Sequence, residues 1–208
     1  MDAKKVILFD FDGVLAHTLE HAFSIHKLLN PQFLWEEFQK MGEGNFHAEY
    51  RKKFEAGGHV HPENYPEEYS KKLAQMNLES ELAELVTELS LIYTLYIVSS
   101  TKTSYIQDFL EREKVLTHFT DVLGADIHES KVVKIKSVLE KEMVAPSQCL
   151  FITDTTGDVH EASECDVPSV CVSWGLHSRE RLEKKNPFTV VDTPKELRVS
   201  IDTFFATI

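Results

Sequence analysis

Short, almost uninterrupted runs of apolar residues alternate along the chain with longer stretches in which apolar residues recur every three or four positions. Continuous apolar runs are typical of strands covered on both faces, and the longer spacing is typical of amphipathic helices. The alternation therefore predicts an α/β fold built on a doubly wound parallel sheet. The runs expected to form its strands are 6–9, 95–98, 121–123, 150–153, 169–172 and 189–191.

Two further patterns predict where helices lie. Apolar residues follow the helical spacing in two stretches, one formed by Leu82, Leu85, Val86 and Leu89 and the other by Val132, Ile135 and Leu139. Near the end of the chain Thr193 is followed by Pro194 and Glu196, the pattern of a capping box with proline in the first turn. We therefore expect helices over both stretches and a C-terminal helix that begins after Thr193.

Residues 16–77 interrupt the alternation. They contain helical stretches and no convincing strand, and they are punctuated by Pro31, Gly42, Gly44, Gly57, Gly58, Pro62 and Pro66. A connection of roughly sixty residues is too long for a simple loop between a strand and a helix. We therefore expect a small α-helical cap at 16–77, inserted after the first strand, and a core domain formed by 1–15 and 78–208.

The composition is that of a folded chain with an acidic surface. Its 208 residues include 34 Asp and Glu against 22 Lys and Arg, a formal net charge of −12. Nucleic acids and anionic membranes bind positive surfaces, so neither is expected as a partner. The run 91–98 is too short to cross a bilayer, and a strand-like run rather than a signal sequence follows the amino end. We expect a cytoplasmic protein that is a monomer or a weak homodimer.

Reactive side chains gather where the predicted strands end. They are Asp10, Asp12, Ser99, Ser100, Asp154 and Asp158, together with Lys131 at the start of a predicted helix. The carboxyl ends of parallel strands meet at one edge of a sheet, so these groups are expected to converge. Clustered carboxylates repel one another unless a cation neutralises them, and an all-oxygen site without His or Cys favours a hard ion. The pattern predicts a Mg²⁺ site.

The same cluster suits the transfer of a phosphoryl group. A metal ion, an ammonium and a hydroxyl together stabilise the charge that spreads over the phosphoryl oxygens. An ionised carboxylate can attack phosphorus and form an aspartyl-phosphate. A second carboxylate two residues away can then protonate the leaving oxygen and later activate water.

The segment Asp10-Phe11-Asp12-Gly13-Val14-Leu15, with Ser99, Lys131 and the pair Asp154 and Asp158, resembles the four motifs of the haloacid dehalogenase (HAD) superfamily in their order. The helical insert between the first two motifs, and the stretch 172–178, resemble the branch of phosphoglycolate phosphatases and β-phosphoglucomutases. The resemblance implies a Rossmannoid core with a helical cap. It also implies Mg²⁺-dependent hydrolysis of a small phosphate monoester.

The resemblance also implies a role for each matching residue. Asp10 is expected to be the nucleophile and a Mg²⁺ ligand, and Asp12 the general acid and base, with its backbone carbonyl on the metal. Ser99 and Lys131 are expected to hold the phosphoryl oxygens, and Ser100 or Thr101 could share the role of Ser99. Asp154 is expected to bind Mg²⁺, with Asp158 binding it directly, through water, or by orienting Asp154. One departure is Thr153, where the family usually has glycine.

Other activities fit parts of the same pattern. Asp12 favours phosphate monoesters, because the dehalogenase and phosphonatase branches lack an aspartate at that position. A phosphomutase of the same fold, which returns its phosphoryl group to a sugar, remains open. A HAD-like binding protein without activity and a phosphorelay receiver fit less well, since all the core residues are present and receivers are shorter and have no cap.

The cap residues that choose a substrate follow no readable motif. His17, just after the first motif, Gly44, in a glycine-containing loop, and Arg51 are the candidates for substrate contact. The pairs His17 with His21 and His59 with His61 lack carboxylates at ligand spacing, so we do not expect them to form metal sites.

Overall fold

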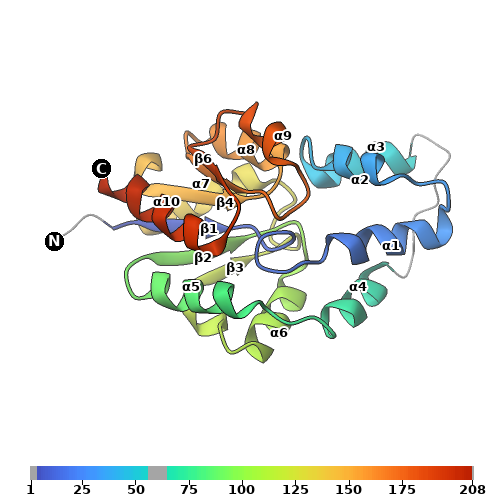
Figure 1. Cartoon of the computed structure of the whole chain (residues 1–208), viewed down its shortest axis with the longest axis horizontal. Helices are drawn as coiled ribbons and strands as arrows, with labels where there is room; N and C mark the ends of the chain where they lie inside the picture. The colour runs from blue at the N-terminus through green and yellow to red at the C-terminus, as the bar shows by residue number, and fades with distance from the viewer. Residues whose placement is uncertain (1–3, 56–64, 208) are drawn as a thin grey trace.

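The computed structural model describes residues 4–55 and 65–207, except for the side chains of 29, 54 and 55, and its centre is a parallel sheet (Figure 1). The six strands lie in the order β3-β2-β1-β4-β5-β6. They are β1 (Val6–Phe9), β2 (Thr94–Val98), β3 (Asp121–Leu123), β4 (Cys149–Thr153), β5 (Ser169–Val172) and β6 (Thr189–Val191). The predicted α/β fold is confirmed, and only β2 and β4 begin one residue earlier than predicted.

Helices cover both faces of this sheet and form a separate group between β1 and β2. Those of the insert are α1 (Leu19–Leu29), α2 (Trp35–Met41), α3 (Phe46–Glu55) and α4 (Tyr65–Leu73), here called the cap helices. The others are α5 (Ser80–Ser90), α6 (Thr103–Arg112), α7 (Lys131–Glu142), α8 (Thr156–Ser163), α9 (Arg179–Glu183) and α10 (Pro194–Ala206). Figure 1 shows the cap helices beyond the carboxyl ends of the strands.

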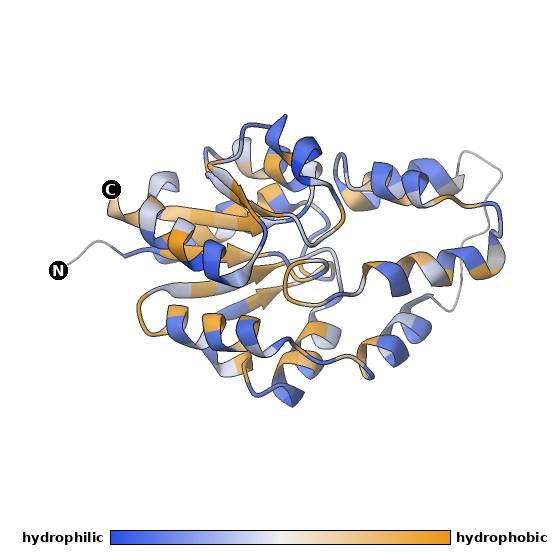
Figure 2. Ribbon diagram, in the orientation of Figure 1, coloured by the Kyte–Doolittle hydropathy of each residue, from blue (hydrophilic) through white to orange (hydrophobic). Residues whose placement is uncertain are grey.

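The alternation of side chains along β1 divides the core into two layers. Ile7 and Phe9 point to the face covered by α5, α6 and α10, whereas Val6 and Leu8 point to the face covered by α7 and α8. All four side chains are fully buried. Figure 2 accordingly shows the strands mainly in the hydrophobic colour, as expected of a parallel sheet covered on both faces.

The predicted helical patterns describe the buried faces well. The four apolar positions of α5 are buried against the sheet, and Ile135 of α7 is fully buried. At α10 the hydroxyl of Thr193 accepts the backbone N–H of Glu196 at 3.2 Å. The Glu196 carboxylate accepts the N–H of Asp192 instead of that of Thr193, a capping box displaced by one residue.

The cap has a small core of its own. Ala22, Phe33, Phe38 and Met41 are buried together with Leu176 from the loop after β5.

In the part of the chain that the structure describes, no helix is long and apolar enough to cross a membrane.

Candidate active site

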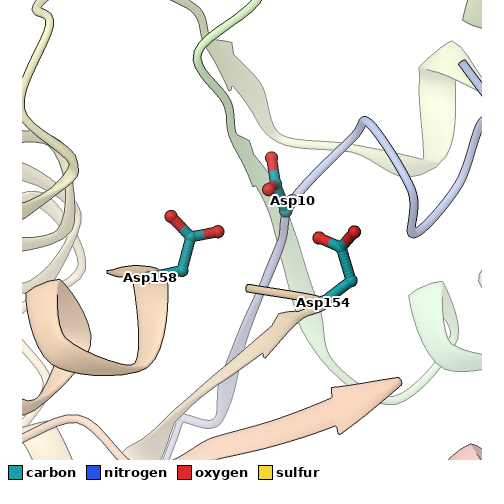
Figure 3. Close-up of side chains that lie close together, drawn as sticks. All are labelled: Asp10, Asp154 and Asp158. Atoms are coloured by element: carbon teal, nitrogen blue, oxygen red, sulfur yellow. The ribbon is translucent and has the colours of Figure 1, made fainter. Parts of the chain in front are cut away.

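Three aspartates meet at the carboxyl edge of the sheet. Asp10 follows β1, Asp154 follows β4, and Asp158 lies in the first turn of α8, so the topology alone brings them together. Figure 3 shows their carboxylates close to one another. One oxygen from each lies within 4.8 Å of the others, and all three residues are buried. Among the described residues they are the one group of His, Cys, Asp and Glu with the spacing of metal ligands.

Two glycines make room for Asp154. A Cβ at Gly13 would lie 2.1 Å from Asp154 Oδ2, and one at Gly175 would lie 2.2 Å from the same oxygen. Gly13 also has φ +74°, a conformation that L side chains rarely adopt. Any side chain at either position would therefore displace the carboxylate.

The two oxygens of Asp154 have different surroundings. Oδ2 accepts the backbone N–H of Leu176 at 2.7 Å, whereas Oδ1 is buried without a hydrogen-bond partner. A buried oxygen with no donor is unfavourable unless another group satisfies it. A hard cation bound between the three aspartates would do so, and the all-oxygen donor set therefore fits Mg²⁺.

Lys131 is the positive charge of this cluster. Its Nζ lies 2.7 Å from Asp10 Oδ2 and 2.7 Å from Asp158 Oδ2. Burial lowers the pKa of Lys131, but Asp10 and Asp158 raise it by more, so the ammonium stays protonated. Because α7 begins at Lys131, the side chain reaches the strand ends from the helix start.

Burial raises the pKa of all three carboxylates, but the interactions that oppose this effect differ from one to the next. It raises the pKa of Asp10 well above the usual range, although Lys131 opposes the shift. It also raises the pKa of Asp154 to about 7, although the Leu176 N–H and Lys131 oppose the shift. Burial raises the pKa of Asp158 too, but Lys131 and further hydrogen bonds outweigh it and the net shift is downward. When all three carboxylates are ionised, the single ammonium leaves an excess of negative charge, which a divalent cation would offset.

The hydroxyl of Thr153 hydrogen-bonds to a member of this cluster. Its Oγ1 donates to Asp158 Oδ2 at 2.6 Å and accepts the backbone N–H of Thr155 at 3.2 Å. The side chain is fully buried in β4. A glycine could not make this contact, so the departure noted in the sequence gives Asp158 a further donor.

Asp12 is held by hydroxyl groups from three parts of the chain. Thr18 Oγ1 donates to Oδ1 at 2.5 Å and Thr101 Oγ1 donates to Oδ2 at 2.7 Å. The hydroxyl of Tyr69, from α4 of the cap, also donates to Oδ1. The sequence analysis did not identify Thr18 or Tyr69, because no motif marks a residue that reaches Asp12 from the cap.

The loop after β2 places its hydroxyl residues at different depths. Ser99 is fully buried, and its Oγ accepts the N–H of Thr101 at 3.0 Å, whereas Ser100 and Thr101 line the cavity described below. Lys134, which the sequence analysis missed, is buried beneath them. Its Nζ donates to the carbonyl of Ser99 at 2.5 Å and so ties this loop to α7.

A cavity of about 260 Å³ connects this edge of the sheet with the cap. The core contributes Asp10, Asp12, Ser100, Thr101, Lys131, Asp154, Thr155 and Asp158. Gly44, Phe38, Phe46, His47 and Tyr69 are among the residues that line the cap end. The cavity therefore has a charged end and a largely apolar end.

Two of the three cap candidates lie outside the lining of this cavity. His17 Nε2 is 3.1 Å from Glu79, and Arg51 Nη1 is 2.7 Å from Glu129. Arg51 therefore joins α3 to the loop before α7, and contact of either residue with a substrate stays a prediction. His59 and His61, like Gly57, Gly58 and Pro62, lie outside the described residues.

Direct hydrogen bonds hold the cap against the core. The Gly157 N–H, at the start of α8, donates to the Gly42 carbonyl at 2.8 Å. The N–H of Thr156 donates to His177 Nδ1 at 3.0 Å, and His177 Nε2 donates to the Gln39 carbonyl at 2.9 Å. Burial lowers the pKa of His177, in keeping with a neutral ring that accepts at one nitrogen and donates at the other. The cap is closed over the carboxylates in this structure.

The family of the chain follows from comparison with known proteins. The model of the haloacid dehalogenase-like hydrolases matches residues 7–172, which include Asp10, Asp12, Asp154 and Asp158. This chain belongs to that family.

Individual relatives agree with this assignment. A phosphoglycolate phosphatase from Synechococcus elongatus is 23% identical over 201 residues, covering 93% of this chain and 95% of its own. A phosphoglycolate phosphatase from Escherichia coli is 26% identical over 104 residues, 49% of this chain and 41% of its own.

Solved structures share the fold. A haloacid dehalogenase-like family hydrolase from Streptococcus pneumoniae superimposes with a TM-score of 0.75 at 22% identity, covering 97% of this chain and all of the other. A protein described as a predicted phosphoglycolate phosphatase from Haemophilus somnus gives 0.74 at 20% identity, over 93% and 96% of the two chains.

Proposed function

We propose that this chain is a Mg²⁺-dependent phosphatase that hydrolyses a small phosphate monoester through an aspartyl-phosphate on Asp10. The observation that carries the proposal is the buried oxygen of Asp154 that lacks a partner, beside Asp10 and Asp158 at the charged end of the cavity. The relatives named phosphoglycolate phosphatase support a small phosphorylated substrate.

In the first step Asp10 attacks the phosphorus atom. A bond forms between the Asp10 carboxylate and phosphorus while the bond from phosphorus to the ester oxygen breaks. Asp12 donates a proton to that leaving oxygen, so the product departs as an alcohol. Lys131 and the hydroxyl of Ser100 hold the phosphoryl oxygens.

Asp10, Asp154 and Asp158 would hold Mg²⁺, which would supply positive charge to offset the negative charge of the phosphoryl group. In the second step Asp12 takes a proton from a water molecule, which attacks the aspartyl-phosphate. The bond between phosphorus and the carboxylate then breaks and inorganic phosphate leaves. The cap limits the access of bulk water while the first group departs.

Phosphate release from p-nitrophenyl phosphate and from a panel of metabolite esters tests this function. We expect the wild type to release phosphate in the presence of Mg²⁺. This activity should be lost when EDTA is added and in the Asp10→Asn variant. Turnover that persists in Asp10→Asn would exclude Asp10 as the nucleophile. Transfer between positions of a sugar bisphosphate, with little free phosphate, would identify a phosphomutase instead.

A further inference from the structure

The cap end of the cavity is lined mainly by aromatic rings. They are Phe38 of α2, Phe46 and Tyr50 of α3, and Tyr65 and Tyr69 of α4. Three different helices thus contribute rings to the space where the alcohol part of a phosphate ester would lie. Leu19 and Ala22 of α1 add further apolar surface.

Contacts between neighbouring rings hold this wall in place. The rings of Tyr65 and Tyr69 are stacked with centroids 6.0 Å apart, and those of Phe46 and Tyr50 are stacked at 6.4 Å. Phe38 meets Phe46 edge to face at 6.3 Å. Phe38 and Tyr69 are also almost completely buried, so their positions are fixed by packing. A planar ring bound in the cavity could therefore pack against the faces and edges of these aromatic side chains without reorienting them.

The cap end offers no cation to an acidic leaving group. Among the described residues that line the cavity, Lys131 is the only Lys or Arg, and it is paired with Asp10 and Asp158 at the opposite end. A carboxylate placed among these rings would therefore be desolvated without a Lys or Arg partner from the described residues.

His47 adds an imidazole to this wall, beside the hydroxyls of Tyr50, Tyr65 and Tyr69. It lines the cavity, and its Nε2 is buried without a hydrogen-bond partner. Burial lowers the pKa of His47, and this outweighs the opposing effect of Glu129, so the ring is neutral near pH 7. A neutral His47 can exchange a hydrogen bond with a neutral substituent, and it offers a carboxylate a hydrogen bond rather than an ion pair.

We propose that the cavity selects a phosphate monoester whose alcohol part is uncharged and carries one aromatic ring, and that it disfavours esters with a carboxylate, such as phosphoglycolate. This inference rests on the proposed function and specifies its substrate class. The volume of about 260 Å³ is just below the usual range for small-molecule sites, which limits the alcohol part to a small group.

Benzyl phosphate and phosphoglycolate form a matched pair for the test. Both release an oxygen bonded to a methylene carbon, so the comparison reports mainly the recognition of a ring against that of a carboxylate. An aromatic contact is worth about 2- to 10-fold and an unpaired buried polar group about 10- to 100-fold. We therefore expect kcat/KM to be about 100-fold higher for benzyl phosphate.

Binding separates recognition from chemistry. Phenethylphosphonate and phosphonopropionate replace the bridging oxygen of the two esters with carbon, so they cannot be hydrolysed at that bond. In the presence of Mg²⁺, calorimetry is expected to give a Kd about 10- to 100-fold lower for phenethylphosphonate. Equal affinities, or tighter binding of phosphonopropionate, would overturn the inference.

A cation introduced into the wall should reverse the preference. Phe46→Arg is expected to raise kcat/KM for phosphoglycolate about tenfold and to lower it for benzyl phosphate. Leu28→Arg makes a similar change on a cap side chain that is 70% exposed and does not line the cavity, so its ratio of kcat/KM values should match the wild type. A reversed ratio in both variants would count against a specific role for the wall.

The outcomes distinguish this inference from the function on which it rests. If the wild type prefers phosphoglycolate and Asp10→Asn abolishes its hydrolysis, the substrate class is wrong and the phosphatase proposal stands. If the wild type hydrolyses neither ester nor any of the wider panel, the phosphatase proposal fails. In that case the Kd values of phenethylphosphonate and phosphonopropionate alone show whether the cavity prefers a ring to a carboxylate.

Discussion

The hydroxyl of Tyr69 donates a hydrogen bond to the carboxylate of Asp12, and this bond joins α4 of the cap to the loop that follows β1. Burial raises the pKa of Tyr69 well above its usual value, and the negative charge of Asp12 adds to the effect, so the hydroxyl keeps its proton. Asp12 therefore has its full set of donors only when the cap is closed. Tyr69 is a positioning residue for the proposed proton transfers.

Tyr69→Phe tests this positioning role. The ring and its packing remain, while one donor to Asp12 is lost, so kcat should fall about tenfold and KM should change little. The pH profile of kcat should also shift, which a purely structural role would not cause. Tyr105→Phe is the control, because its ring lies 6.5 Å from that of Tyr69 and does not line the cavity. An unchanged kcat and pH profile in Tyr69→Phe would contradict the prediction.

Removal of Lys131 should leave the carboxylate cluster without its internal cation. Lys131→Met is expected to lower the free energy of unfolding of the metal-free protein by about 3–5 kcal/mol, measured by urea denaturation in EDTA. Lys141→Met is the matched control, since Lys141 pairs with Asp121 on the surface, is 53% exposed, and should contribute less than about 1 kcal/mol. Similar losses of unfolding free energy in the two variants would mean that the buried ion pairs of Lys131 stabilise the protein no more than the surface pair of Lys141.

Thr153 should affect the binding of the metal without contacting it. Thr153→Val preserves the shape of the side chain but removes the hydrogen bond to Asp158, so the Kd for Mg²⁺ should rise about 10- to 100-fold. Calorimetric titration of the metal-free protein with Mg²⁺ measures this. Thr94→Val, at the start of β2, should leave the affinity unchanged. Unaltered Mg²⁺ affinity in Thr153→Val would show that Asp158 is oriented without this donor.

His177 should make the stability of the protein depend on pH. Its pKa in the folded state lies below the value of 6.5 expected when the chain unfolds, so the unfolded chain binds more protons between these two values. The contribution of His177 is therefore complete above pH 6.5 and is lost as the pH falls through the folded-state pKa.

Urea denaturation at pH 5 and pH 7 measures this difference. The gain in the free energy of unfolding between the two conditions should be smaller in His177→Gln than in the wild type. His160→Gln replaces a histidine whose side chain is 65% exposed and should keep the gain of the wild type. An undiminished gain in His177→Gln would assign the pH dependence to other groups.

The sheet and the aspartates could be predicted because each depends on a short stretch of sequence and one rule of topology. The run 6–9 is long and apolar enough to indicate a buried strand, and a parallel sheet places Asp10 and Asp154 at the same edge. Neither inference requires knowledge of how helices pack.

The contacts of the cap could not be predicted in this way. Tyr69 reaches Asp12 only because α4 packs against α1, and no spacing in the sequence encodes that contact. Arg51 and His17 are instead paired with acidic side chains, Glu129 and Glu79. Which acid an exposed basic side chain meets depends on the folded surface, so a prediction from residue type alone could not identify these pairs.

The close approach of Gly157 to Gly44 limits how caps can be exchanged between relatives. A Cβ at Gly157 would lie 2.3 Å from the Gly44 carbonyl oxygen, so any larger residue there would push the loop of the cap away from α8. A chimera that joins this core to another cap must bring a loop that fits against Gly157 just as closely. Exchange of a whole cap can therefore change the substrate range only where the new loop fits against this one position in the core.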